Sequence, residues 1–317
     1  MTDETHTVLV TGASGFIGRP SVAALLARGF RVHAASRHVP PMIPSGVTWH
    51  AADLLEASQR HALVEQTKPT HLLHLAWYVE HGKFWTAPEN ADWVPASLDL
   101  LRLFAAHGGR RAVFTGSCAE YDWSRGGSEP YRETDPCRPS TPYGRAKLAL
   151  LEQGALLAAS SGVSFAWARF FLMFGEGEDT RRLIPSIVRG LMNNEPVALS
   201  SGRQIRDFLD TRDIGAGLGA LLSAETVTGP VNVASGRAVS IGDVARMLAK
   251  IAGRPEALLQ FGALPDREGE PASLVADVSR LTREAGFTPV HTLEERLAES
   301  FGWHRKAIRP IVLPPSL

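Results

Sequence analysis

The sequence predicts an α/β fold, in which a doubly wound parallel sheet is followed by a smaller C-terminal α/β lobe. Three observations predict it. A glycine-rich turn lies between an apolar strand and a helix within residues 7–29. Strand and helix patterns then alternate up to residue 171, which is typical of a parallel sheet covered by helices. Beyond that point the alternation loosens, which indicates a second lobe with a cleft between the two.

The composition is that of an ordinary globular protein. The chain has 317 residues, of which 44% are hydrophobic and 21% charged, so it can bury a large core. Because 33 basic residues balance 33 acidic ones, we expect no binding to nucleic acid or to an anionic membrane. No apolar run is long enough to cross a bilayer, and the early first strand leaves no room for a signal peptide. The only two cysteines, Cys118 and Cys137, suit a reducing compartment, so we expect a cytoplasmic protein.

The turn from Thr11 to Gly18 predicts a dinucleotide site, because it follows a strand and opens a helix. Gly12 permits the tight turn, Gly15 lets backbone N–H groups approach a pyrophosphate, and Gly18 lets the helix pack closely on the strand. The start of the helix adds a partial positive charge. The spacing Gly-x-x-Gly-x-x-Gly differs from the usual Gly-x-Gly-x-x-Gly. A turn with a purely structural role is the alternative.

The second predicted strand, residues 31–35, ends at Ser36 and Arg37. At this point of a dinucleotide fold an acidic residue binds the free 2′-hydroxyl of the adenosine ribose, whereas an arginine accommodates a 2′-phosphate. No acidic residue is present here. Ser36 offers a hydroxyl, and Arg37 offers a fixed positive charge. We therefore expect NADP, with NAD as the alternative; Arg37 as a merely exposed residue is the competing interpretation.

Two more strands are predicted before the middle of the chain. Residues 47–52 end at Asp53, which could accept a hydrogen bond from the adenine amino group or cap the following helix. Residues 71–77 are almost entirely apolar, as expected for a buried parallel strand. We expect His71 and His74 to pack in the core and no metal site to form, since no acid or cysteine is spaced to complete one.

The next segments bring polar and aromatic groups to the edge where parallel strands end. Residues 78–85 form an aromatic loop at a place where open α/β sheets bind ligands. This loop could shape a substrate pocket or only cover the core. A helix is predicted over residues 93–107, and a strand over 111–115 leads to Ser117. A Pro-rich loop, residues 122–142, has too little periodicity for a regular element.

The rest of the chain completes the sheet and adds a lobe. Pro142, preceded by two residues that can cap a helix, starts a helix that runs to about residue 159, and a sixth strand covers residues 164–171. Later segments are read as helices at residues 183–192, 241–252, 278–285 and 293–301, and as a basic turn at 202–208. We divide the chain into a Rossmann cofactor-binding domain, 1–172, and a mainly substrate-binding lobe, 173–317. A strand at 231–234 is expected to return to the larger sheet.

Tyr143 and Lys147 stand four residues apart on one face of the helix. An ammonium group beside a phenol should lower the tyrosine pKa from its usual value of about 10. Ser117, at the end of the neighbouring strand, could bind the same substrate oxygen. Together with a nicotinamide, these groups would interconvert an alcohol and a ketone. A tyrosine and a lysine at this spacing also occur by chance, but the glycine turn and Ser117 favour a catalytic role.

These motifs resemble the extended short-chain dehydrogenase/reductase family of NAD(P)-dependent nucleotide-sugar epimerases, dehydratases and reductases. The resemblance covers nearly the whole chain. It is carried by Thr11-Gly12-x-x-Gly15-x-x-Gly18, Asp53-Leu54, His74-Leu75-Ala76, Ser117 four residues before Tyr121, Tyr143-x-x-x-Lys147, Arg169-x-Phe171 before Phe174-Gly175, and Arg206-Asp207-Phe208.

The resemblance implies roles for residues of this chain. Ser117, Tyr143 and Lys147 would be the catalytic residues, with Lys147 also holding the nicotinamide ribose. The expected cofactor-binding residues are Gly12, Gly15, Phe16, Ile17, Gly18, Ser36, Arg37, Asp53, Leu54, Leu75, Ala76, Tyr143, Lys147 and Phe170. The expected substrate-binding residues are Trp77, Cys118, Leu172, Arg206 and Arg267. The two arginines would bind a diphosphate; solvated surface arginines are the alternative. A homodimer formed through the helices at residues 93–107 and 142–159 is also implied.

Departures from the family pattern narrow the activity. Sugar 4,6-dehydratases carry an Asp-Glu pair after the catalytic Ser or Thr, where this chain has Cys118 and Ala119, so a dehydratase is disfavoured. Leu172 replaces a frequent asparagine and Glu176 the usual proline, which leaves the nucleotide open. We predict an NADPH-dependent reductase of a keto-sugar, with a nucleotide-linked 4-keto-6-deoxyhexose as the expected substrate.

Two other activities fit the same residues. A nucleotide-sugar 4-epimerase with a tightly held NAD would use Ser117, Tyr143 and Lys147 for a transient oxidation. A non-catalytic dinucleotide sensor would need only the glycine turn, and the presence of Tyr143 and Lys147 speaks against it.

Overall fold

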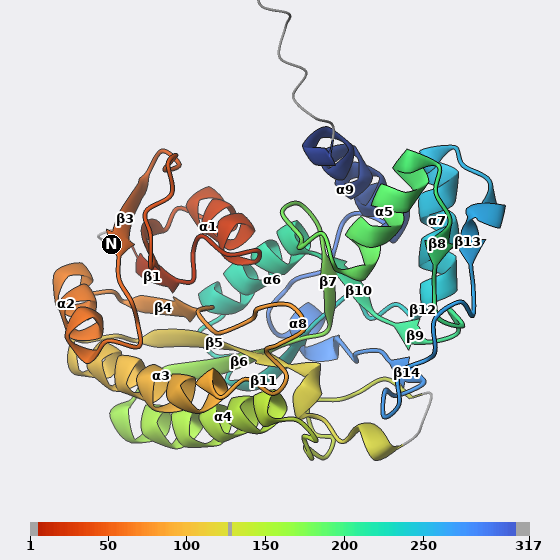
Figure 1. Cartoon of the computed structure of the whole chain (residues 1–317). Coiled ribbons are helices and arrows are strands. Elements are labelled where there is room, and N and C mark those ends of the chain that lie inside the picture. Colours follow the sequence, from red (N-terminus) through yellow and green to blue (C-terminus); the bar gives the residue numbers. More distant parts are fainter. Residues whose placement is uncertain (1–5, 126–128, 309–317) are drawn as a thin grey trace, which may run out of the picture.

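A computed structural model describes residues 6–125 and 129–308 (Figure 1). Its main layer is a sheet of seven parallel strands in the order β11-β6-β5-β4-β1-β2-β3. The strands are β1 (Thr7–Thr11), β2 (Arg31–Ser36), β3 (Val47–Ala51), β4 (His71–His74), β5 (Arg111–Ser117), β6 (Ser164–Phe170) and β11 (Gly229–Val233). All seven strands therefore end at the same edge, and the order reverses beside β1, where such sheets bind ligands. The predicted fold class is confirmed.

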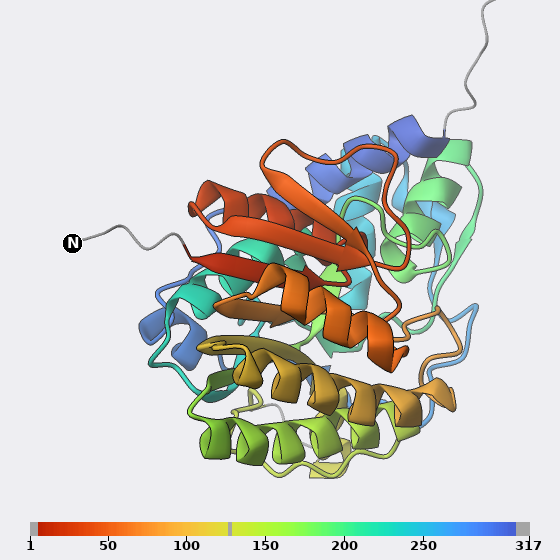
Figure 2. The ribbon, with the colours of Figure 1, turned by 90° about the vertical axis from the view of Figure 1, so that its left-hand side faces the viewer.

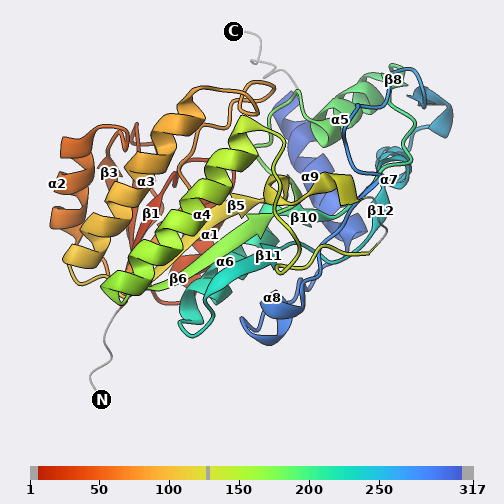
Figure 3. The same cartoon turned by 90° about the horizontal axis from the view of Figure 1, so that it is seen from below.

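Helices cover both faces of this sheet. They are α1 (Gly18–Ala27), α2 (Ala57–Thr67), α3 (Glu89–Ala106), α4 (Pro142–Ser161) and α6 (Thr211–Ser223). Along β1, Val8 and Val10 pack toward α1 and α6, while Leu9 packs toward α2, α3 and α4. Alternate residues of a strand point to opposite faces, so each face acquires its own core. Figures 2 and 3 show α3 and α4 running side by side.

A smaller lobe lies beyond the carboxyl ends of β5 and β6 (Figure 3). Its helices α5 (Leu183–Asn193), α7 (Ile241–Ala252) and α9 (Leu293–Ile308) enclose a separate hydrophobic core. Three small sheets complete it. They pair β7 (Leu172–Phe174) with β10 (Phe208–Asp210), β9 (Ile205–Arg206) with both β12 (Val239–Ser240) and β14 (Ser273–Leu274), and β8 (Val197–Ala198) with β13 (Leu259–Gln260). The short helix α8 (Ser279–Arg283) packs beside β11. The division at residues 172/173 stays a proposal.

Several boundaries differ from the sequence-based expectation. The strand β4 ends at His74 rather than residue 77, and beyond it the N–H groups of Leu75 and Ala76 donate to the hydroxyl of Thr11 at 3.2 Å and 3.3 Å. The helix α3 starts at Glu89 rather than residue 93 and includes Pro95. The segment 202–208, predicted as a turn, contains β9 and the start of β10. By contrast, α4, α7 and the return of β11 to β6 lie where the sequence predicted them.

The helix α6 was missed altogether. Its three glycines weaken any helical pattern in the sequence, since glycine is a poor helix former. In the structure Gly215 permits close packing on α1, because a Cβ atom there would lie 2.7 Å from the backbone of Pro20, whereas Gly217 faces Phe287. The side chain of Asp210 caps the helix by accepting a hydrogen bond from the N–H of Arg212. Tertiary packing, rather than local preference, forms this helix.

Two further features concern the environment of the chain. Within residues 6–125 and 129–308, no helix is long and apolar enough to cross a membrane. Cys118 and Cys137 are both free thiols. The Pro-rich loop at 122–142 contains a short 3-10 turn, Trp123–Arg125, and residues 126–128 of this loop lie outside the described part.

Candidate active site

The glycine turn is the predicted pyrophosphate site. Gly12 has a φ of +66°, and a Cβ there would lie 2.8 Å from the backbone nitrogen of Ala76. A Cβ on Gly18 would lie 2.2 Å from the carbonyl oxygen of Gly12, so close packing within the protein requires both glycines. Gly15 is different, because it is exposed and its Cβ would meet only one atom, at 3.1 Å. An exposed glycine at the opening of α1, where the helix dipole adds positive charge, suits the predicted phosphate contact.

At the strand end predicted to meet the ribose, the hydroxyl of Ser36 already makes hydrogen bonds within the protein. The hydroxyl of Ser36 donates to the carbonyl of His38 at 2.7 Å and accepts from Nε1 of Trp49 at 3.0 Å. Arg37 is exposed, and no ion pair or hydrogen bond engages it within the described part of the chain. Its guanidinium is thus available to a ligand, whereas the serine hydroxyl already braces the strand end.

The predicted adenine contacts lie at the end of β3. Asp53 Oδ1 accepts from the N–H of Leu55 at 3.0 Å. Because α2 starts only at Ala57, Asp53 caps a turn before the helix rather than the helix itself. Leu54 is buried, and its carbonyl accepts from Nη1 of Arg60 at 2.6 Å. The contact of Asp53 and Leu54 with adenine stays a prediction.

Ser117, Tyr143 and Lys147 come together where β5 ends and α4 begins. Thr141 caps α4 by accepting from the N–H of Gly144 at 3.1 Å, which places Tyr143 and Lys147 in its first two turns. The hydroxyl of Ser117 is close enough to the phenol of Tyr143 to oppose the effect of burial on its pKa. Nζ of Lys147 donates to the carbonyl of Thr115 at 2.8 Å. The three side chains therefore gather at the edge where the strands of the sheet end.

Burial controls the protonation of this group. It raises the pKa of Tyr143 well above its usual value, although the Ser117 hydrogen bond opposes the shift. It lowers the pKa of Lys147 to about 7, against the attraction of the Glu120 carboxylate. The prediction that the ammonium lowers the phenol's pKa is wrong for this structure, because Nζ lies 6.0 Å from the centre of the Tyr143 ring and burial dominates.

The indole ring of Trp77 packs against the ammonium group of Lys147. The ammonium lies 3.7 Å from the centre of the Trp77 ring, a cation–π contact. Nε1 of Trp77 donates to Oδ1 of Asn90 at 2.9 Å, which fixes the ring. Trp77 is buried, so its predicted contact with substrate stays untested. Phe170, predicted to meet the cofactor, ends β6 in register with Ser117.

Glu120 was not singled out from the sequence, yet its carboxylate fixes the backbone at Ser117, one of the predicted catalytic residues. Its carboxylate is fully buried and accepts from the N–H of Ser117 at 2.7 Å and from Nε of Arg169 at 2.7 Å. Nε1 of Trp167 donates to the same group at 3.0 Å. In return the hydroxyl of Ser117 accepts from the N–H of Ala119 at 3.2 Å. The Ser-x-x-Glu spacing of a capping box was the signal that could have identified it.

An aromatic wall flanks Tyr143; it consists of Phe84, Trp85 and Trp123. The ring centres of Phe84 and Trp85 lie 5.0 Å and 5.7 Å from that of Tyr143, both edge-on. The centre of Trp123 lies 6.3 Å from that of Trp85, and its Nε1 donates to the carbonyl of Cys118 at 2.9 Å. The aromatic loop after β4 thus reaches the catalytic residues, as a substrate pocket would require.

The two arginines expected to bind a diphosphate meet at one carboxylate. Nη2 of Arg206 lies 2.9 Å from Oε2 of Glu270, and Nη1 of Arg267 lies 3.5 Å from Oε1 of the same residue. Arg206 is buried, whereas Arg267 is exposed. An anionic ligand would compete with Glu270 for both guanidinium groups. Leu172, the third residue expected near the nucleotide, is half-buried at the start of β7.

Cys118 occupies the position where the family's dehydratases carry an acid. Burial raises the pKa of its thiol to about 12, while the nearby charge of Arg206 opposes the shift. The thiol therefore keeps its proton at neutral pH. Neither Cys118 nor Ala119 next to it can act as a general acid.

Another contact missed from the sequence covers the glycine turn. Arg182 lies with its guanidinium carbon 5.9 Å from the ring centre of Phe16. Its Nε is 3.2 Å from Oε1 of Glu178, whose burial raises the pKa of the carboxyl to about 7. These residues join the smaller lobe to the cofactor turn. No spacing in the sequence could have indicated this long-range contact.

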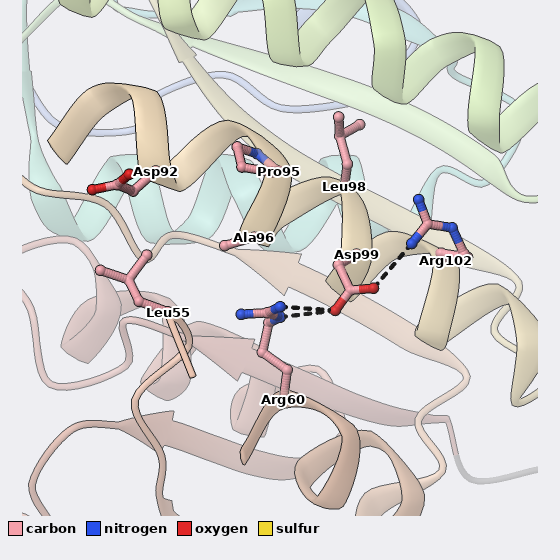
Figure 4. Close-up of a pocket in the computed structure, with 8 residues that line it drawn as sticks. All are labelled: Leu55, Arg60, Asp92, Pro95, Ala96, Leu98, Asp99 and Arg102. Atoms are coloured by element: carbon pink, nitrogen blue, oxygen red, sulfur yellow. Dashed lines mark hydrogen bonds and ion pairs between the residues drawn. The ribbon is translucent and has the colours of Figure 1, made fainter. Parts of the chain in front are cut away.

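A cavity of about 600 Å³ lies away from the catalytic residues, between α2 and α3 (Figure 4). Arg60 crosses it to bind Asp99, which also binds Arg102. The lining residues are Leu55, Arg60, Asp92, Pro95, Ala96, Leu98, Asp99 and Arg102. None of Ser117, Tyr143 and Lys147 lines it, so this cavity lies apart from the predicted catalytic residues.

A model of the NAD dependent epimerase/dehydratase family matches residues 8–234, a span that includes the glycine turn, Ser117, Tyr143 and Lys147. The chain belongs to this family. It is an NAD-dependent enzyme of the extended short-chain dehydrogenase/reductase type, which confirms the resemblance seen in the sequence. As a member of the NAD dependent epimerase/dehydratase family, it shares its fold with proteins of known activity.

Three of these proteins illustrate the similarity. UDP-glucose 4-epimerase of Halalkalibacterium halodurans is 26% identical over 94% of this chain and 96% of its own length. dTDP-glucose 4,6-dehydratase of Streptomyces griseus is 26% identical over 99% of both chains. The solved structure of MoeE5 in complex with UDP-glucuronic acid and NAD is 29% identical, with a TM-score of 0.80 over 95% of this chain and 100% of that one.

Proposed function

We propose that this enzyme is an NAD-dependent nucleotide-sugar 4-epimerase. The observation that carries the proposal is that Ser117, Tyr143 and Lys147 gather at one edge of the sheet, next to a buried thiol and an alanine where a dehydratase needs carboxylic acids. The similarity to UDP-glucose 4-epimerases favours this activity over the keto-sugar reductase expected first from the sequence.

Epimerisation at C4 of a sugar removes a hydroxyl proton and a hydrogen from carbon and then returns both. Tyr143 is the residue placed to take the proton and give it back, so no net proton is consumed. The hydroxyl of Ser117 would hold the same sugar oxygen, and Lys147 would hold the nicotinamide ribose. When bound, the oxidised nicotinamide supplies the hydride acceptor and a positive charge that favours the phenolate of Tyr143.

Binding of the nucleotide sugar would involve the smaller lobe. Arg206 and Arg267 both face the carboxylate of Glu270, and a diphosphate would take the place of that carboxylate. The aromatic wall beside Tyr143 would then contact the sugar. A small-molecule substrate of this kind agrees with a family member solved with UDP-glucuronic acid.

The test is incubation of the purified enzyme with UDP-glucose, UDP-galactose, UDP-glucuronic acid or dTDP-glucose, followed by chromatography of the products. We expect the C4 epimer of at least one of them, with no net formation of reduced cofactor. Loss of water from the sugar, or no reaction with any nucleotide sugar, would overturn the proposal. Tyr143→Phe is the control for a contaminating activity.

A reductase that uses NADPH is the second candidate, and Arg37 is the observation that favours it. Such an enzyme would oxidise added NADPH stoichiometrically with a nucleotide-linked 4-keto-6-deoxyhexose. The epimerase would leave that cofactor unchanged.

Cofactor selectivity can be tested at Arg37. If its guanidinium meets a 2′-phosphate, Arg37→Ala should weaken NADP binding by about 1.5–3 kcal/mol, the scale of a hydrogen bond to a charged group. Binding of NAD should stay nearly unchanged, because NAD lacks that phosphate. Calorimetric titration of both cofactors measures the difference. Equal losses for NAD and NADP would mean that Arg37 supports the fold instead.

We also infer a homodimer formed through α3 and α4, which pack against each other on the outer face (Figure 3). Leu156 of α4 is 74% exposed, and a second copy would cover it. Light scattering at micromolar protein should give twice the mass of one chain. A monomeric mass would contradict this assembly.

A further inference from the structure

Three potential metal ligands meet at the edge of the sheet opposite the catalytic residues. His6 precedes β1, His71 starts β4, and Glu225 follows α6. One ligand atom from each lies within 4.8 Å of the others. The sequence offered no sign of this group, because Glu225 stands 154 residues after His71. The fold, rather than local spacing, brings the missing carboxylate to the histidines.

His71 is held in the orientation that a ligand needs. It is 1% exposed, and its Nδ1 lies 2.9 Å from Oγ1 of Thr70. The Thr70 hydroxyl is itself fixed, because the backbone N–H of Thr7 donates to it at 3.1 Å. A second hydrogen-bonding partner on one ring nitrogen is typical of metal-binding histidines, since it orients the other nitrogen. Here that other nitrogen, Nε2, faces Oε1 of Glu225 at 3.2 Å.

The separations suit a small cation. Zn²⁺ binds histidine nitrogen and carboxylate oxygen at about 2.0–2.2 Å, so two tetrahedral ligand atoms stand roughly 3.3 Å apart. His71 Nε2 and Glu225 Oε1 already have nearly this separation. The rings of His6 and His71 have centres 4.7 Å apart. His6 and Glu225 are both exposed, so rotation of their side chains can close the remaining gap.

The surrounding charges restrict which cation fits. Nη2 of Arg110 lies 3.4 Å from Nδ1 of His6, and the Arg110 side chain must move away from His6 when a cation binds. Two imidazoles and one carboxylate favour zinc, nickel or copper over magnesium and calcium, which prefer oxygen ligands.

We propose that His6, His71 and Glu225 form a binding site for a divalent transition-metal ion such as Zn²⁺, with water as the fourth ligand. The site lies at the amino ends of β1 and β4, whereas Ser117 and Tyr143 lie beyond the carboxyl end of β5. A bound ion would therefore tie the first strand to β4 and to the connection after α6. Its effect is on stability and not on the reaction.

The experiment uses the full chain without a polyhistidine tag, freed of metal by a chelator. Zn²⁺, Ni²⁺ or Mg²⁺ is added, and both calorimetric binding and the thermal midpoint are measured. We expect one Zn²⁺ per chain and a higher midpoint with Zn²⁺, and no effect of Mg²⁺. Glu225→Gln and His6→Gln should each abolish the tight binding of Zn²⁺ and the rise in midpoint.

The matched control is His61→Gln, which removes an exposed histidine that also faces a glutamate, at 3.8 Å. This variant should bind Zn²⁺ like the wild type. His6 is exposed, so His6→Gln keeps the test informative if Glu225→Gln fails to fold. Absence of Zn²⁺ binding to the wild-type chain, or equal binding by all four proteins, would overturn the proposal.

Discussion

Replacing Tyr143 by phenylalanine should lower kcat by about 10²- to 10⁴-fold, the contribution of a positioned general acid or base. The change removes only the hydroxyl. The ring keeps its edge-on contacts with Phe84 and Trp85, so the fold should persist. Because only the hydroxyl is lost and the ring stays in place, cofactor affinity should stay close to that of the wild type.

Steady-state rates beside cofactor titrations measure this prediction. Ser117→Ala is the graded companion, and loss of one preorganised donor should reduce kcat by roughly 10- to 1000-fold. Lys147→Ala should also weaken cofactor binding, because its ammonium is the group expected at the nicotinamide ribose. Near-normal turnover of Tyr143→Phe with an identified substrate would contradict the mechanism and revive the non-catalytic sensor.

Local patterns in the sequence were sufficient to predict the sheet and the helix α4, which carries Tyr143 and Lys147. The glycine turn, the apolar strands and the capped start of α4 are each determined within about ten residues, so their signals survive without tertiary knowledge. The strand β11 was also found, although it pairs with a strand some sixty residues earlier. Its short apolar run was a sufficient signal.

The features that were missed depend on contacts across the chain. Gly215 of α6 is explained only by its contact with α1, because it lets the two helices approach closely. The carboxylate of Glu225 reaches His71 only in the folded sheet. The pKa of Tyr143 was predicted in the wrong direction, because the spacing from Lys147 is visible in sequence but the depth of burial is not. Periodicity does not encode such distances.

Removal of the Glu120 carboxylate should be the most damaging single change to stability. It leaves the guanidinium of Arg169, which is 2% exposed, without its charged partner. Breaking a buried ion pair on one side costs about 3–5 kcal/mol. We therefore expect Glu120→Ala to lose that much free energy of unfolding in urea, a large part of the roughly 5–15 kcal/mol of a typical domain.

An exposed ion pair provides the control. Lys250 and Glu294 lie 2.9 Å apart with both side chains largely exposed, and pairs of this kind contribute about 0–1 kcal/mol. Glu294→Ala should therefore change stability little. If Glu120→Ala were equally mild, Arg169 would be satisfied by its contacts with the carbonyl of Glu133 and the thiol of Cys137.

The double variant Glu120→Leu/Arg169→Met separates support of the fold from support of the reaction. Apolar replacement of both charges removes the unpaired group, so much of the lost stability should return. Turnover should stay low, because the N–H of Ser117 still lacks its acceptor. The backbone that positions the Ser117 hydroxyl is then no longer fixed. Recovery of both stability and kcat would show that Glu120 serves only the fold.

Glu120→Gln should in addition move the pH dependence of the reaction. The carboxylate stabilises the ammonium of Lys147, whose pKa burial lowers to about 7. Without that negative charge the ammonium loses its proton at lower pH, so the limb of the pH–rate profile that reports Lys147 should shift toward acid. The amide keeps an acceptor for the N–H of Ser117, which isolates the electrostatic effect. An unshifted limb, measured as kcat against pH, would mean that Glu120 acts on Ser117 alone.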